Sequence, residues 1–175
     1  MKEKGTGGGN TITGLNFEKE RDILEILKKA KNYSIKGNTI YYKKKEVAKS
    51  FRKHGLYRFL AEKKVNWHKL LSKRLLPDEA LYVIVNNTLF IIEMKFQKVS
   101  GSVDEKLQTC DFKKKQYKKL MAPLNIEVEY IYILNDWFKA PIYKDTLDYV
   151  IATGCQYYFN YLPLQKIGLP VPAKD

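Results

Sequence analysis

The spacing of apolar residues changes near residue 80 of the chain. Before this point, apolar side chains recur three or four positions apart, which is the period of an amphipathic helix. Asn16 is a suitable N-cap for the first such segment. The pattern predicts one short strand, Asn38–Tyr42, among four helices over Phe17–Lys31, Lys45–Arg52, Leu56–Lys63 and Trp67–Lys73.

After this point, runs rich in Val, Ile, Leu and Phe predict strands. Asn86-Asn87 joins the first two runs, and asparagine tolerates the positive φ that a hairpin turn requires. A helix is expected from Ser102 or Asp104 to about Leu120. The other predicted elements are the strands Ala80–Val85, Thr88–Phe96 and Val128–Leu134, a helix over Tyr143–Ala152, and an aromatic tail, Tyr157–Pro172, packed as a strap.

A length of 175 residues with 45% hydrophobic residues indicates one packed domain, which we place at residues 13–175 after a flexible arm at 1–12. The longest apolar run, Ala80–Val85, is far below the ~20 residues of a membrane span. The two cysteines form no CxxC motif, which fits a reducing compartment and predicts a cytoplasmic protein. Two histidines are too few for a histidine-based metal nuclease.

The positive charge is concentrated in the first part of the chain. The net charge is +13, and residues 1–75 carry all of it, with 20 Lys and Arg against 7 Asp and Glu. A basic lobe beside a neutral one favours a polyanionic partner, because lysines near phosphates release condensed counterions. We therefore expect residues 36–75 to be a basic helical part that contacts DNA, whereas a merely solvated surface is the alternative for any single lysine.

Two carboxylates are expected to meet at the predicted hairpin. Asp78 precedes its first strand and Glu93 lies on its second, at similar distances from the turn. Strand side chains alternate, so Glu93, Lys95 and Gln97 share one face. Paired carboxylates suit Mg²⁺, which takes oxygen ligands and can activate water and neutralise a phosphate oxygen. The alternative is a Glu–Lys pair on a solvated face of the sheet.

At these residues the sequence resembles the PD-(D/E)xK nucleases, and among them the small type II restriction endonucleases. Pro77-Asp78, a gap of 14 residues and Glu93-Met94-Lys95 match the signature of that superfamily. The resemblance extends over about residues 10–169. It includes four further segments, Thr13–Glu18, Gly101–Thr109, Lys113–Tyr117 and Tyr157–Leu164.

The resemblance implies an α/β fold with a mixed central sheet flanked by helices, Mg²⁺ dependence and cleavage of duplex DNA. Asp78, Glu93 and the main-chain carbonyl of Met94 would hold the metal, and Lys95 would orient the attacking water. Glu18 would be a secondary metal ligand, or a surface residue of the first helical turn. Gln97 would reach a phosphate or Lys95, or remain an exposed polar residue.

DNA contacts are expected from several polar segments. Ser102 and Gln108 lie near the predicted catalytic strand end, and the basic lobe supplies phosphate contacts that position a duplex without reading it. Arg and Asn side chains can read base edges, and Asn10, Asn38, Arg58 and Arg74 qualify by type. The predicted DNA-binding residues are Asn10, Lys43, Lys44, Lys45, Arg58, Ser102, Gln108, Lys113 and Lys114.

The leading hypothesis is a sequence-specific, Mg²⁺-dependent endodeoxyribonuclease. Cleavage of both strands of a symmetric site needs two active sites, so a homodimer is expected. A DNA methyltransferase that acts separately is a further expected partner. No membrane partner is expected. Two alternatives stay open. One is a structure-selective repair or junction nuclease of the same fold, and the other is a basic DNA-binding protein without catalysis.

Overall fold

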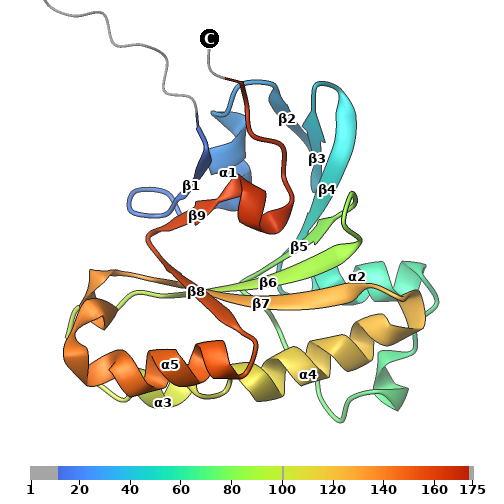
Figure 1. Ribbon diagram of the computed structural model, residues 1–175. Helices are drawn as coiled ribbons and strands as arrows, with labels where there is room; N and C mark the ends of the chain where they lie inside the picture. Colours follow the sequence, from blue (N-terminus) through green and yellow to red (C-terminus); the bar gives the residue numbers. More distant parts are fainter. Residues whose placement is uncertain (1–11, 100, 174–175) are drawn as a thin grey trace, which may run out of the picture.

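The computed structural model describes residues 12–99 and 101–173, and its centre is a mixed seven-stranded sheet with helices on both faces (Figure 1). The strand order follows the chain, from β2 to β8. The four pairings from β2 to β6 are antiparallel and the two from β6 to β8 are parallel. The strands of this sheet are β2 (Tyr33–Lys36), β3 (Thr39–Tyr42), β4 (Lys45–Phe51), β5 (Glu79–Val83), β6 (Thr88–Lys95), β7 (Glu127–Leu134) and β8 (Gln156–Phe159).

Each face of the sheet has its own apolar core. One face packs against α2 (Gly55–Glu62), α4 (Cys110–Met121) and α5 (Lys144–Ala152), with α3 (Val103–Leu107) beside them. The other face is covered by α1 (Ile23–Lys28) and a small antiparallel pair, β1 (Gly14–Asn16) with β9 (Tyr161–Pro163). The described residues also form the short 3-10 helices η1 (Trp67–Lys69), η2 (Ala122–Leu124), η3 (Asp136–Lys139), η4 (Pro141–Tyr143) and η5 (Leu164–Ile167).

The predicted hairpin and the strand after it are confirmed as β5, β6 and β7. Parallel strands need a crossover connection, and α3 and α4 provide it between β6 and β7 across one face of the sheet (Figure 1). This arrangement places the start of β5, the end of β6 and one side of α4 close together. Among the described residues, no helix combines the length and apolar character needed to cross a bilayer.

The helix predicted over Lys45–Arg52 is wrong, because this segment is strand β4, paired with both β3 and β5. Tyr42 pairs with Lys45, so Lys43 and Lys44 form a two-residue turn, with φ of 47° and 66°. Such a turn usually carries Asn or Gly, so the two lysines conceal the hairpin in the sequence. The prediction that residues 36–75 are a helical part is therefore wrong, because they hold β3, β4 and the end of β2 as well as α2. The predicted arm at 1–12 lies outside the described residues except for Ile12.

Other predicted helices are shorter in the structure. Asn16 belongs to β1, and its Oδ1 accepts the N–H of Glu18 at 2.9 Å, so the first helix begins only after the N-cap Asp22. The segment Trp67–Lys73 holds only η1. The helix expected up to Leu120 is divided into α3 and α4, because Thr109 bonds back to the Lys106 carbonyl.

Asp22 joins α1 to the sheet. Its carboxylate accepts the N–H groups of Leu24 and Glu25 at 2.9 and 3.3 Å, and it lies 2.6 Å from a guanidinium nitrogen of Arg52. Burial opposes the charged form, but the Arg52 bond and these N–H groups outweigh it and hold the pKa of Asp22 below its ordinary value. The helix cap and the ion pair thus depend on one ionised carboxylate.

Replacing Asp22 with Ala should lower the free energy of unfolding by about 1 kcal/mol, the usual loss for an N-cap. Asp22→Asn retains the cap oxygen and should lose less. Because the folded-state pKa is depressed, the stabilisation is present above pH 3.8 and is lost as the pH falls through the folded value. Urea unfolding at pH 7 and pH 3 should show that the difference in free energy of unfolding between the wild type and Asp22→Ala is smaller at pH 3. A larger difference at pH 3 contradicts this.

Candidate active site

The β5–β6 hairpin brings the two predicted carboxylates together. Glu79 pairs with Ile92 in the antiparallel register, so Asp78 stands opposite Glu93 one step further along. The Asp78 carboxylate accepts the backbone N–H of Met94 at 3.2 Å. The hairpin therefore fixes both carboxylates at one end of the sheet.

Glu93 is a buried charge with two cationic partners. Its residue is only 5% exposed, on the sheet face that α4 covers. The Lys113 ammonium, from α4, lies 3.0 Å from both carboxylate oxygens, and the Lys95 ammonium lies 3.2 Å from Oε2. Burial raises the pKa of Glu93, but the Lys113 charge, the Tyr130 hydroxyl and the Lys95 charge together more than offset it, so the net pKa is lowered and Glu93 is ionised at neutral pH.

Two buried tyrosines complete the surroundings of Glu93. Burial and the Glu93 charge raise the pKa of Tyr130 and of Tyr117, and the Asp78 charge contributes at Tyr117. Both hydroxyls are thus neutral, and Tyr117 of α4 lies on the side of the sheet that both carboxylates face. The buried Tyr130 hydroxyl lies beside the Glu93 carboxylate and favours its charged form.

A cavity of about 420 Å³ adjoins Asp78. Glu79, the next residue of the chain, points to the opposite face of the sheet and is only 2% exposed. It accepts the Ser50 hydroxyl at 2.5 Å and Arg52 Nε at 2.9 Å. Burial raises the pKa of Glu79 in spite of these two bonds. The cavity is lined by Glu20, Arg21, Asp22, Arg52, Lys53, Asp78, Glu79 and Met94.

Glu20, and not the predicted Glu18, lines this cavity. Glu18 lies exposed in the turn after β1, because the first helix begins later than expected. Glu20 lies between β1 and α1 and lines the same cavity as Asp78. Its Oε1 also accepts the Asp22 N–H at 2.8 Å. No signal in the sequence distinguishes these two glutamates without the position of β1.

Gln97 continues the face of Glu93 and Lys95, but its side chain bonds to the nearby Val99 carbonyl. Its backbone exchanges two hydrogen bonds with the Asn135 side chain, at 3.1 and 2.7 Å, which ties the ends of β6 and β7 together. Ser102 and Gln108 are the exposed end residues of α3. The structure therefore places Gln97 as a loop-holding residue close to the site.

The two lysines predicted to bind DNA on α4 differ in their surroundings. Lys113 reaches Glu93, as described above. Lys114 is only 8% exposed, and its ammonium bonds to Glu129 at 2.9 Å and to the Gly154 carbonyl at 2.6 Å. It is directed into the protein, so its predicted phosphate contact does not fit the structure. Lys43, Lys44, Lys45 and Arg58 are exposed, and Asn10 lies outside the described residues.

The donor atoms at the hairpin suit a hard cation. Asp78 is exposed, and in the described part of the chain its carboxylate accepts the Met94 N–H, while Glu93 stands opposite it in the hairpin. Among residues 12–99 and 101–173, no group of three or more His, Cys, Asp and Glu side chains is close enough to share a metal. A cation held by two carboxylates that retains several waters matches the preference of Mg²⁺.

Comparison of the chain with protein-family models, with curated proteins and with solved structures finds no match. The function of the chain is therefore inferred from the geometry of this site.

Replacing Lys113 with Met removes the closest cation from Glu93 and should lower the free energy of unfolding at pH 7 by about 1–3 kcal/mol. The depressed pKa of Glu93 means that the stabilisation is present above about pH 4.5 and is lost at lower pH, so the deficit should shrink towards pH 4. Urea unfolding of the wild type and the variant at pH 7 and pH 4 measures this deficit. Lys115→Met is the matched control, because Lys115 is exposed and pairs only with Asp111; equal stability of the two variants contradicts the assignment.

Proposed function

We propose that the chain is a Mg²⁺-dependent endodeoxyribonuclease of the PD-(D/E)xK type, acting as a sequence-specific type II restriction endonuclease. The observation that carries the proposal is the assembly of Asp78, Glu93 and Lys95 at one end of the β5–β6 hairpin, with Asp78 bonded to the Met94 N–H. The resemblance implies a mixed sheet flanked by helices, and the chain has such a sheet, with a helical crossover between β6 and β7.

In this proposal Asp78, Glu93 and the Met94 carbonyl would hold Mg²⁺. The cation would supply a Lewis acid that activates water and stabilises charge on the phosphate. Lys95 would orient the attacking water, which gives up a proton to solvent as its oxygen bonds to phosphorus, while the bond to the leaving 3′ oxygen breaks and that oxygen takes a proton from solvent. Lys113 keeps Glu93 ionised and fixes its orientation, so it acts as a positioning residue.

The partners follow from this chemistry. Duplex DNA is the substrate, and two copies of the chain would supply the two active sites that cleavage of both strands requires. A cognate DNA methyltransferase, acting separately, would protect the host genome, and the site of action would be the cytoplasm. A repair or junction nuclease of the same fold would use the same residues but recognise the structure of the DNA.

One observation favours a different function, a basic DNA-binding protein without catalysis. Lys113 already contacts both oxygens of Glu93 at 3.0 Å, so the buried carboxylate is neutralised without a metal. Under this alternative Asp78 and Lys95 have no catalytic role. The two functions differ in whether Mg²⁺ produces strand breaks.

Replacing Asp78 with Asn or Lys95 with Met should reduce Mg²⁺-dependent cleavage of plasmid DNA at least 100-fold, as expected when one group that stabilises the transition state is removed. DNA binding in EDTA should survive, because neither residue is needed for the contacts made by the basic lobe. Plasmid nicking and fluorescence anisotropy measure the two properties.

Lys139→Met is the control, because Lys139 is exposed and lies on η3, where it pairs with Asp136. This variant should cleave like the wild type. Cleavage that persists in Asp78→Asn, or no cleavage by the wild type with any duplex despite binding, contradicts the catalytic proposal.

A further inference from the structure

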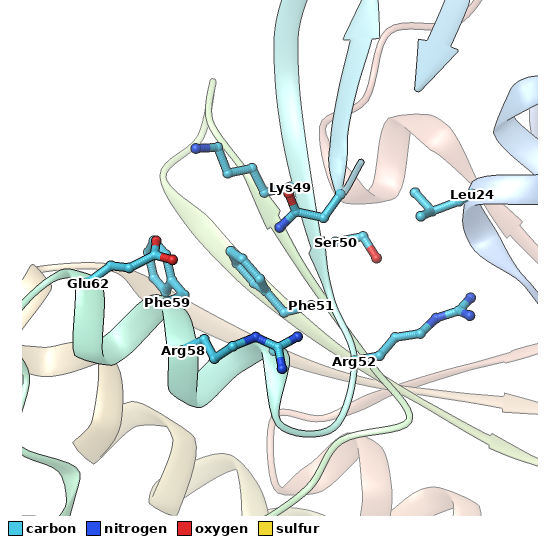
Figure 2. Close-up of a pocket in the computed structure, with 10 residues that line it drawn as sticks. Leu24, Lys49, Ser50, Phe51, Arg52, Arg58, Phe59 and Glu62 are labelled. Carbon is cyan, nitrogen blue, oxygen red and sulfur yellow. The ribbon is translucent and has the colours of Figure 1, made fainter. Parts of the chain in front are cut away.

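A second cavity, of about 480 Å³, shares the lining residue Arg52 with the cavity that adjoins Asp78 (Figure 2). Its walls come from the end of β4, from α2 and from α1. Figure 2 shows Lys49, Arg52 and Arg58 around it, with Glu62 on the helix that carries Arg58. Three cationic side chains against one carboxylate make this cavity suited to an anionic ligand.

The three cations differ in how far the protein already satisfies them. Arg52 is bonded to both Asp22 and Glu79. Lys49 lies 3.5 Å from Glu46 in an exposed pair, which contributes little. Arg58 is exposed and has no carboxylate partner in the described part of the chain, so its guanidinium is available to a ligand.

Arg52 links this cavity to the cavity that adjoins Asp78, because it lines both. On one side Arg52 borders the cavity that contains Asp78, and on the other it borders the cavity that contains Arg58. A linear polyanion that passes Arg58 and Lys49 would therefore reach Arg52 and then Asp78.

The aromatic residues of the cavity argue against stacking of a base. Phe51 and Phe59 stack on each other, with ring centroids 4.7 Å apart and an interplanar angle of 27°, and both are buried. Neither ring has a free face of the kind that single-strand binding proteins offer to bases. The polar atoms available to a ligand are instead the charged groups that bind phosphate.

We propose that this cavity binds the sugar-phosphate backbone of the DNA strand that enters the active site, with Arg58 and Lys49 holding its phosphates. The inference rests on the proposed function for the identity of the polymer. It also selects Arg58 and Lys49, among the basic residues of the first 75 positions, as residues that bind the DNA backbone.

Binding of a fluorescent mixed-sequence duplex, measured by anisotropy in EDTA over a range of salt concentrations, tests the proposal without cleavage. Arg58→Ala and Lys49→Ala should each weaken binding roughly tenfold. Each should also reduce the slope of log K against log salt by about 0.9, the value for one phosphate contact. Lys166→Ala is the matched control, because Lys166 is exposed on η5 and lines neither cavity.

Arg58→Lys retains the charge and should recover most of the affinity. If Arg58→Lys binds as weakly as Arg58→Ala while the salt slope stays at the wild-type value, the guanidinium reads a base edge and the phosphate assignment is wrong. Binding by Arg58→Ala equal to that by Lys166→Ala overturns the proposal whether or not the protein cleaves DNA.

The cleavage assay separates this proposal from the nuclease proposal. Loss of binding in Arg58→Ala, with no Mg²⁺-dependent cleavage by the wild type, supports the cavity as a DNA site and removes the nuclease. A wild type that binds no duplex at any salt concentration overturns both.

Discussion

Glu93 carries a negative charge on the largely apolar sheet face that packs against α4, and the Lys113 ammonium 3.0 Å away allows this charge to remain there. An unpaired buried carboxylate would be costly, and it would take up a proton instead. The pair therefore makes the ionised state of Glu93 depend on where α4 lies. Lys114, the next residue, bonds to Glu129 on β7 and to the Gly154 carbonyl before β8, so two adjacent lysines fix this helix over the sheet.

A second ion network lies on the opposite face. Glu79 bonds to Ser50 and Arg52 on the β4 side, and Arg52 extends the contact to the N-cap of α1. Because side chains alternate along a strand, Asp78 and Glu79 point to opposite faces, so Glu79 anchors the start of β5 while Asp78 remains exposed. The catalytic proposal uses this division, in which one carboxylate holds the strand and its neighbour is available for a cation.

The hairpin could be predicted from the sequence because apolar runs and an Asn-Asn turn are local signals, and the opposition of Asp78 and Glu93 follows from them. The position of β4 could not, since its turn consists of Lys43 and Lys44 in a conformation that lysine rarely adopts. That Glu20 lines the cavity beside Asp78 and Glu18 does not could not be predicted, because it depends on the pairing of β1 with β9, a contact between distant parts of the chain. Lys113 could be assigned to a helix face, but its contact with Glu93 depends on how that helix crosses the sheet.

The central claim is that these residues hydrolyse duplex DNA with Mg²⁺. The most direct measurement is incubation of the wild-type protein with unmethylated phage DNA, with and without Mg²⁺, followed by sequencing of the fragment ends. The account predicts discrete fragments, only with Mg²⁺, whose ends share a common sequence. Intact DNA under all conditions, in the presence of demonstrated binding, would contradict it.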